Sequence, residues 1–530
     1  MYRLAVSRAR KTTLAWTLIA ALILSGLAAS GCFLSEPNPN GGRIGENPDA
    51  ANPNDPNNPA NPNLPGGPGG PGSSGDPGSS GNPGGSEGPG NSGDPGGTGS
   101  PDGSGHPGGS MDPGDSEDPE NPDVPEYYIR CYQDGTLLPE SSTPDFSRDI
   151  KKIAAGPSGI QLIDYPKGYM VNVPTGMKFD FSCSPDYTRI YGKNLEIRIS
   201  RDTSPYAEVK WWISTLPNEY ITDKTYREAN DITVYEDGWT DIGGWRVRLF
   251  RLTRTPSEGS AWTQNSYAYA YIHTAGLTYF TLHFRSDSQD TLEAVVRSVI
   301  GSFQTFEPQG KSTYKLDFHP VLPKWSEETA ALYERIRGLD HILWGFFTPN
   351  PFTPEGKAKR QEVEERLDFE FPVIMWYRYL GHEFPLDGMR DAYAEGKLVE
   401  LTYQIGGDLY GRNPNFDVLD GKMLDDIRMF ARGAKEFGHP FLFRLNNEMN
   451  STWVSYSGHL SLCDPGIFIE IWRTVYRIFQ EEGVDNAIWI WNPNDVSYPP
   501  CKWNSHVAYY PGRGCCQKDR RSPTHELRSR

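Results

Sequence analysis

The sequence has few apolar residues for its length. They make up 36% of the 530 residues. The shortage is local, because residues 32–125 consist almost entirely of Pro, Gly, Ser, Asn and Asp. A segment of this composition cannot bury enough apolar surface to offset the entropy lost on ordering it. We therefore predict a disordered linker at 32–125. The lack of a strict Gly-X-Y period excludes collagen.

Positive charge is also scarce. Lys and Arg number 51 against 68 Asp and Glu, which gives a net charge of -17. This balance excludes nucleic acid as an expected partner, whereas a neutral polysaccharide remains compatible with it. No cofactor motif is present, and His382-Glu383 lacks a second His at helical spacing that could help bind zinc. We expect a monomer without metal or cofactor.

Long hydrophobic runs are missing except at the start of the chain. A basic beginning is followed by an apolar run from Leu14 to Ala29 and by the small residues before Cys32. This pattern is typical of a bacterial lipoprotein signal, in which the Cys is diacylated and becomes the mature N-terminus. We predict a signal peptide at 1–31 and an extracytoplasmic protein that is lipid-anchored to the bacterial cell membrane at Cys32. The alternative is an uncleaved membrane anchor, because the run is near the lower length limit for spanning.

Cysteines are few, but their number fits an oxidising compartment. Of the seven, Cys131 and Cys183 fall in one predicted domain and Cys463 and Cys501 in the next. Two disulfides within domains are therefore expected, although spacing alone does not prove the pairing.

Residues 126–310 are predicted to form an α+β domain of unknown function. Alternating patterns indicate strands, and a helix follows with Asp287-Ser288 before it and its end near Ser302. The expected strands are 168–173, 177–182, 194–200, 245–253, 265–273 and 278–285. The order loosely resembles the PsbP-like fold. The row of Tyr267, Tyr269 and Tyr271 on one sheet face could be a sugar platform, but we favour half-buried core or helix-packing surface.

Residues 311–512 alternate short apolar runs with amphipathic stretches. This pattern indicates a parallel α/β fold. The expected strands are 341–347, 371–379, 398–405, 440–445, 487–491 and 507–510, and the expected helices are 328–337, 388–395, 421–437 and 466–483. Each of the first five strands ends in polar or aromatic residues, such as Trp376 after the second. Because the C-terminal strand ends converge on the active site in a (β/α)8 barrel, this enrichment is expected of an enzyme, and Trp376 is a candidate for substrate binding.

The strongest chemical signal is Asn447-Glu448 at the end of the fourth of these strands. Retaining glycosidases use a carboxylic acid there to protonate the leaving oxygen, and an adjacent amide to bind the 2-hydroxyl of the sugar. Arg444 precedes the pair, Met449-Asn450 and Trp453 follow it, and Trp489-Ile490-Trp491-Asn492-Pro493-Asn494 comes some forty residues later.

This combination resembles glycoside hydrolase family 26, chiefly β-mannanases, over about residues 320–512. The resemblance implies a (β/α)8 TIM barrel and retaining hydrolysis of a β-mannan-like polysaccharide at the cell surface. It makes Glu448 the general acid/base. It also makes several other residues candidates for substrate binding: Arg444, Trp453, Trp491, Asn492 and Asn494. Asn447 departs from the family, which usually has His at that place. It is a further candidate for substrate binding, because an Asn beside the acid is usual in the wider clan of retaining barrel enzymes.

The resemblance breaks after Gly512. The stretch 513–530 contains paired Cys and many Arg but no apolar run for a strand, and it has the composition of a read-through after a frameshift. A genuine divergent tail is the alternative. The family's nucleophile, a Glu that ends the seventh strand, has no counterpart, so we expect an incomplete barrel and a truncated, inactive chain. A non-catalytic glycan-binding or wall-associated lipoprotein is the second hypothesis.

Overall fold

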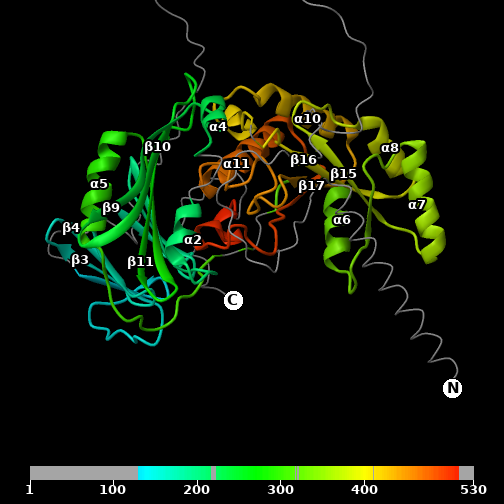
Figure 1. Cartoon of the computed structure of the whole chain (residues 1–530). Helices are drawn as coiled ribbons and strands as arrows, with labels where there is room; N and C mark the ends of the chain where they lie inside the picture. Colours follow the sequence, from blue (N-terminus) through cyan, green and yellow to red (C-terminus); the bar gives the residue numbers. More distant parts are fainter. Residues whose placement is uncertain (1–128, 217–221, 317, 319–321, 410, 513–530) are drawn as a thin grey trace, which may run out of the picture. The chain divides into compact units, whose positions relative to one another are not determined.

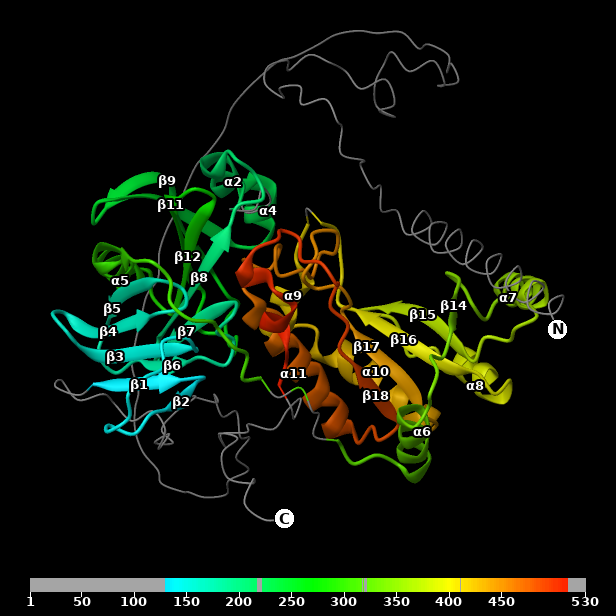
Figure 2. The same ribbon diagram turned by 90° about the horizontal axis from the view of Figure 1, so that it is seen from below.

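The computed structural model describes residues 129–216, 222–316, 318, 322–409 and 411–512. The predicted signal peptide, the linker, Cys32 and the stretch 513–530 lie outside these residues. In the described part of the chain, no helix has the length and apolar character needed to cross a membrane. An antiparallel domain (residues 129–310) precedes an α/β domain (residues 322–512) (Figures 1 and 2).

The antiparallel domain contains two sheets. The first has the order β13-β5-β4-β3-β1-β2 and the second β6-β7-β8-β12-β11-β10-β9. Their strands are β1 (Arg130–Gln133), β2 (Thr136–Leu137), β3 (Ile150–Gly156), β4 (Gly159–Asp164), β5 (Tyr169–Val173), β6 (Lys178–Asp180), β7 (Tyr187–Tyr191), β8 (Leu195–Thr203), β9 (Ile232–Ile242), β10 (Trp245–Arg254), β11 (Ser266–Ala275), β12 (Thr278–Ser286) and β13 (Gln304–Thr305). Every pairing is antiparallel, and each of the six stretches that were expected to be strands overlaps one.

The two faces of the seven-stranded sheet bury different partners. Helix α5 (Gln289–Ser302), capped by Ser288, packs its apolar stripe against one face. On β11, Ala268 and Ala270 face this helix-side core, whereas Tyr267, Tyr269 and Tyr271 belong to a core shared with the α/β domain. The tyrosine row is therefore buried packing surface, as favoured from the sequence, and each ring is at most 3% exposed. Helices α2 (Val209–Thr215) and α4 (Lys224–Ala229) complete the domain.

The α/β domain contains a parallel sheet with the order β14-β15-β16-β17-β18. Its strands are β14 (Gly345–Phe347), β15 (Val373–Tyr379), β16 (Leu398–Gln404), β17 (Phe441–Leu445) and β18 (Ala487–Ile490). The helices are α6 (Glu327–Arg337), α7 (Pro354–Leu367), α8 (Leu386–Ala394), α9 (Pro414–Leu419), α10 (Leu424–Phe437) and α11 (Pro465–Glu482), followed by the 3₁₀ turns η1 (Lys502–Asn504) and η2 (His506–Tyr509).

Alternation along the parallel strands separates a helix-facing side from an inner side. Phe443 of β17 packs on Phe479 of α11 at 4.8 Å between ring centroids, and on Trp489 of β18 at 4.7 Å. Tyr403 of β16 stacks on Phe430 of α10 at 4.2 Å. These apolar contacts hold α10 and α11 against the sheet, because helix and sheet each bury their apolar face on the other.

Most predicted elements of this domain are present, but the run 507–510 is not a strand. It forms η2, which packs on α11. The ring centroids of Tyr509 and Phe468 are 5.8 Å apart. Helices α7 and α9 had no counterpart in the sequence prediction. The resemblance of the antiparallel domain to PsbP-like proteins stays a prediction.

The prediction of disulfides is wrong for the described cysteines. Cys131, Cys183, Cys463 and Cys501 are all free thiols. Cys463 and Cys501 do follow neighbouring strands, but Cys501 Sγ lies 3.4 Å from the hydroxyl of Tyr279, and Cys463 Sγ lies 3.8 Å from the carbonyl of His459. Burial raises the pKa of both thiols, so both are protonated at neutral pH.

Candidate active site

The inner side of the parallel sheet carries polar residues in register. Tyr377, Thr402 and Arg444 are directly paired across β15, β16 and β17, and Met375 and Glu400 form the layer below. The carboxyl ends of parallel strands meet at one edge, where the active site of an α/β barrel lies. These residues therefore form the floor beneath the loop that carries Glu448.

Arg444 is the centre of this floor. Its Nε donates to Thr402 Oγ1 at 2.8 Å, and its Nη2 donates to the hydroxyl of Tyr377 at 3.0 Å. Its Nη1 lies 2.9 Å from Glu400 Oε1 and donates to Asn492 Oδ1 at 3.1 Å. Each nitrogen of the guanidinium thus has a protein partner. Arg444 ties four strands or strand ends together.

The amide of Asn447 is held by two neighbours. Gln404 Nε2 donates to Asn447 Oδ1 at 2.9 Å, and the hydroxyl of Tyr456 donates to the Asn447 carbonyl at 2.9 Å. Burial raises the pKa of Tyr456 well above its ordinary value, so this hydroxyl stays protonated. Among the described residues, Asn447 Nδ2 makes no hydrogen bond. This orientation leaves the Nδ2 donor available to a hydroxyl of a bound sugar.

Glu448 projects from a strained turn beside an exposed tryptophan. Its φ is 58°, a left-handed conformation that is uncommon for a residue other than Gly and that clusters at functional sites. Its backbone N–H donates to the Asn492 carbonyl at 2.8 Å, and Trp453 Nε1 donates to its Oε2 at 2.9 Å. The Trp453 ring lies 5.4 Å from that of Tyr498. Both rings are more than a third exposed, so a carboxylate and two aromatic surfaces face solvent together.

The loop after β18 is tied to the loop after β17 through Asn450. Asn494 N–H donates to Asn450 Oδ1 at 2.7 Å, and Asn450 Nδ2 donates to the Asn494 carbonyl at 3.0 Å. Asn492 accepts from both Arg444 and Glu448. The predicted residues Asn492 and Asn494 therefore act within the protein as links that join the loop after β18 to Glu448 and to Asn450.

Two predicted tryptophans lie away from this group. Trp376 belongs to the helix-facing side of β15, where it meets Phe352 at 4.9 Å and contacts α8 at Gly388. Trp491 packs with Tyr510 and Phe318, at 5.3 Å and 6.5 Å between ring centroids. Neither ring is paired with Glu448 or Trp453.

Glu400 and Tyr456 are site residues that the sequence analysis missed. Glu400 stands alone as a carboxylate inside the apolar run 398–405, where Glu400, Thr402 and Gln404 alternate at the strand period. That alternation is a usable signal for an inner face. Tyr456 lies in a loop, and no periodic pattern connects it with Gln404.

Four carboxylates lie in the loops that follow the central strands of the sheet. Glu448, after β17, is partly buried and is fixed by Trp453, whereas Glu383, Asp408 and Asp495 are exposed. Within the described ranges, no three His, Cys, Asp or Glu side chains gather as metal ligands do. Such a site can donate a proton to a leaving oxygen and hold a sugar ring against aromatic surfaces.

The strand ends of this parallel α/β domain thus bring together an acid, an amide and exposed aromatic rings. Residues 412–516 match the family model for glycosyl hydrolase family 26. The chain therefore resembles this family, as the sequence predicted, and the match implies a (β/α)8 barrel-like domain.

Three solved structures show the extent of the likeness. A family 26 glycoside hydrolase from Muricauda sp. has 19% identity and a TM-score of 0.30, over 36% of this chain and 71% of that one. A Bacillus subtilis mannanase has 15% identity and a TM-score of 0.30, over 37% of this chain and 70% of the mannanase. The third is a β-mannanase from a symbiotic protist of the termite Reticulitermes speratus, complexed with gluco-manno-oligosaccharide. It has 13% identity and a TM-score of 0.32, over 39% of this chain and 72% of the mannanase. No curated protein is similar enough in sequence to count as a relative.

Proposed function

We propose that the protein is by descent a cell-surface glycoside hydrolase of the β-mannanase type, with a retaining, two-carboxylate mechanism, and that the 530-residue chain itself is inactive. The observation that carries this proposal is the position of Glu448: it leaves β17 within the segment that matches the family model, and its carboxylate accepts from Trp453 at 2.9 Å. The substrate is a β-mannan-like polysaccharide.

Glu448 is the general acid/base in this proposal. Protonating the glycosidic oxygen requires a carboxylic acid that reaches the leaving group, while an aromatic ring supports the apolar face of the sugar. Trp453 supplies the ring and also fixes one oxygen of Glu448. Asn447 Nδ2 is the donor to the 2-hydroxyl, because Gln404 holds the other atom of the amide.

A specific observation also favours binding without cleavage. Retaining hydrolysis needs a second carboxylate about 5–5.5 Å from the first. Among the described carboxylates on or just after the neighbouring strands, Glu383, Asp408 and Asp495 are exposed, and Glu400 is paired with Arg444. These surroundings favour a site that offers a proton donor and aromatic surfaces without a second carboxylate placed for attack. The second candidate function is a non-catalytic glycan-binding lipoprotein.

The 530-residue chain is expected to bind β-1,4-mannohexaose and to release no measurable reducing ends from mannan. Trp453→Ala should weaken binding about tenfold, because truncating a tryptophan at the centre of a contact surface typically costs this much. Titration calorimetry and a reducing-sugar assay measure the two quantities. Trp211→Ala is the matched control, since Trp211 is exposed on α2 of the other domain.

Absence of mannohexaose binding would refute the mannan-directed proposal in both its forms. Robust hydrolysis would instead show that a second carboxylate of this chain acts as the nucleophile, and the described candidates would be tested first. Glu400, Glu383, Asp408 and Asp495 would then be replaced in turn by the corresponding amide, and loss of the glycosyl-enzyme intermediate would identify the residue.

The proposal includes a lipid anchor on Cys32, motivated by Ala29-Ser30-Gly31-Cys32 after an apolar run. We expect the mature protein to begin at Cys32, to carry diacylglycerol there and to partition with membranes into detergent. Mass spectrometry of the N-terminal peptide measures this. A mature chain that still begins at Met1, or is cleaved elsewhere, would contradict it, and Cys32→Ser should abolish lipid attachment.

A further inference from the structure

Two tyrosine hydroxyl groups of the antiparallel domain, on the side that meets the α/β domain, donate hydrogen bonds to one loop. That loop, residues 446–464, runs from β17 to α11 and carries Glu448 and Trp453. The hydroxyl of Tyr226 donates to the Leu460 carbonyl at 2.6 Å, and the hydroxyl of Tyr269 donates to the Leu462 carbonyl. Burial raises the pKa of both tyrosines, so both groups remain donors at neutral pH.

The end of the loop needs such support. Leu462 and Cys463 are consecutive residues other than Gly with φ of 56° and 50°. Left-handed conformations of bulky residues are strained and persist only where surrounding structure holds them. The hydrogen bond to the Leu462 carbonyl comes from Tyr269, on a strand 193 residues earlier in the chain.

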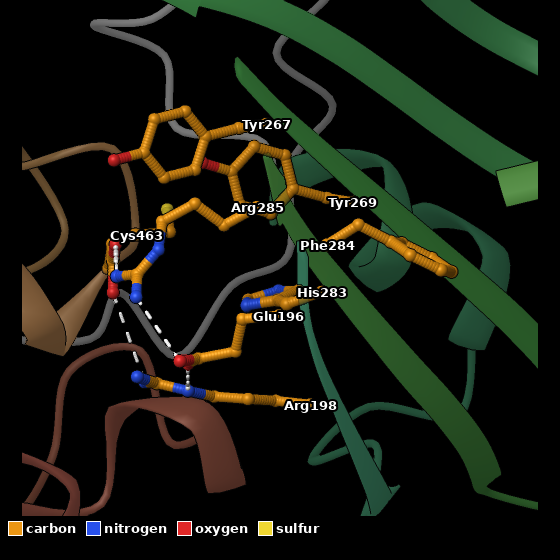
Figure 3. A pocket seen from close by; sticks show the side chains of 9 residues that line it. Glu196, Arg198, Tyr267, Tyr269, His283, Phe284, Arg285 and Cys463 are labelled. Carbon is orange, nitrogen blue, oxygen red and sulfur yellow. Dashed lines mark hydrogen bonds and ion pairs between the residues drawn. The ribbon is translucent and has the colours of Figure 1, made fainter. Parts of the chain in front are cut away.

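A buried charge network completes the attachment. Asp464 Oδ2 accepts from Arg285 Nη1 at 2.7 Å, and Asp464 Oδ1 accepts from the Gly466 N–H at the start of α11. Glu196 is shared by Arg198 at 2.7 Å and by Arg285 at 3.2 Å (Figure 3). The cavity between these side chains is only about 20 Å³, room for a water molecule rather than a ligand.

The loop is also connected internally, from this anchor back to the acid. Gly458 N–H donates to the Met449 carbonyl at 2.9 Å, and Ser451 N–H donates to the Glu448 carbonyl at 3.0 Å. A side chain on Gly458 would meet the hydroxyl of Tyr509 at 1.9 Å, so the loop passes close against η2 there. The loop is therefore hydrogen-bonded between the anchored end and Glu448, so a displacement of the anchored end would also shift Glu448.

The neighbouring loops are held by the same domain. Asp202 of β8 accepts from the Lys502 N–H at 2.7 Å in the stretch that follows Tyr498. Arg254 of β10 pairs with Asp420 at the end of α9, and Ser257 N–H donates to the same carboxylate at 3.2 Å. The loops after β16, β17 and β18 each have a bond to the antiparallel domain.

We propose that the antiparallel domain is an internal brace of the candidate active site, in which Tyr226 and Tyr269 are positioning residues that fix the loop carrying Glu448 and Trp453. The part of this inference that concerns glycan affinity depends on the proposed function. The part that concerns the order of the loop does not.

The test compares the double variant Tyr226→Phe/Tyr269→Phe with Tyr267→Phe in the 530-residue chain. Tyr267 is the matched control, because it stacks on Tyr269 at 6.3 Å in the same row, but its hydroxyl accepts from Trp262 of its own domain. Amide hydrogen exchange is measured in peptides from 446–464, with 150–164 as an internal reference. We expect exchange about tenfold faster in the loop of the double variant, including Glu448 and Gly458, because two carbonyls lose their donors.

Mannohexaose affinity supplies the second measurement. The double variant should bind about two- to thirty-fold more weakly, the range seen for residues that act through a coupled element, and Tyr267→Phe should bind as the unaltered chain does. Loop exchange equal to that of the control would overturn the brace. Faster exchange without weaker binding would overturn the positioning role. If the unaltered chain binds no mannohexaose, the proposed function fails, and exchange alone decides the brace.

Discussion

Asp464→Ala is expected to lower the free energy of unfolding by about 3–5 kcal/mol, the cost of breaking a buried ion pair by removing one partner. The side chain is 8% exposed and lies 2.7 Å from Arg285 and 3.9 Å from Arg198. Removing it leaves two buried guanidinium groups with Glu196 as the carboxylate they share. The N-terminus of α11 also loses the oxygen that accepts from Gly466.

Neighbouring groups cannot compensate for this loss. Burial lowers the pKa of His283 to about 3, so its ring is neutral at pH 7 and adds no charge. Burial raises the pKa of Glu196, but Arg189, Arg198 and Arg285 outweigh this effect and bring the pKa well below its ordinary range. Glu196 is thus already ionised and shared at pH 7. It has no further charge to offer when Asp464 is absent.

Urea unfolding at pH 7 measures the change, with two further variants to separate its causes. Asp464→Asn keeps an oxygen that can cap α11 but removes the charge. Its free energy of unfolding should therefore lie between those of the unaltered chain and Asp464→Ala. Asp340→Ala removes a fully exposed carboxylate and should leave the unfolding curve unchanged. A loss for Asp464→Ala no larger than that of Asp340→Ala would show that the network adds nothing to stability.

The sequence predicted the parallel sheet because its strands are short apolar runs between amphipathic helices. Strands β15 to β18 match those runs to within two residues at either end. The run 507–510 has the same composition, but no described strand pairs with it, and Tyr509 is buried against Phe468 instead. Composition indicates that a segment is buried. It does not indicate whether a strand lies beside it.

The candidate acid was predictable, whereas its support was not. Glu448 stands in a local motif with Asn447 and Trp453, and a motif can be found in a single sequence. The hydrogen bonds from Tyr226 and Tyr269 join residues 234 and 193 positions apart, across two domains. The tyrosine alternation indicated burial, but nothing local to it identified the loop that it contacts.

Arg444→Met is expected to destabilise the α/β domain by about 3–5 kcal/mol, because it leaves the carboxylate of Glu400 buried without its cation. The pair is separated by 2.9 Å, with side chains 10% and 17% exposed. The same change removes the donors to Thr402, Tyr377 and Asn492. Because Asn492 also accepts from the Glu448 N–H, mannohexaose binding should weaken together with stability.

A second change separates the charge effect from the lost hydrogen bonds. In Arg444→Met/Glu400→Gln the buried carboxylate is gone, so about 1–3 kcal/mol of the loss should be recovered, the usual size of coupling between residues in contact. Arg390→Met is the control, since Arg390 is half exposed and pairs with Glu436 on the surface. If Glu400→Gln gave no recovery in the Arg444→Met background, Glu400 would not be the counter-ion that holds the floor. The hydrogen bonds that Arg444 donates to its neutral neighbours would then account for the whole loss.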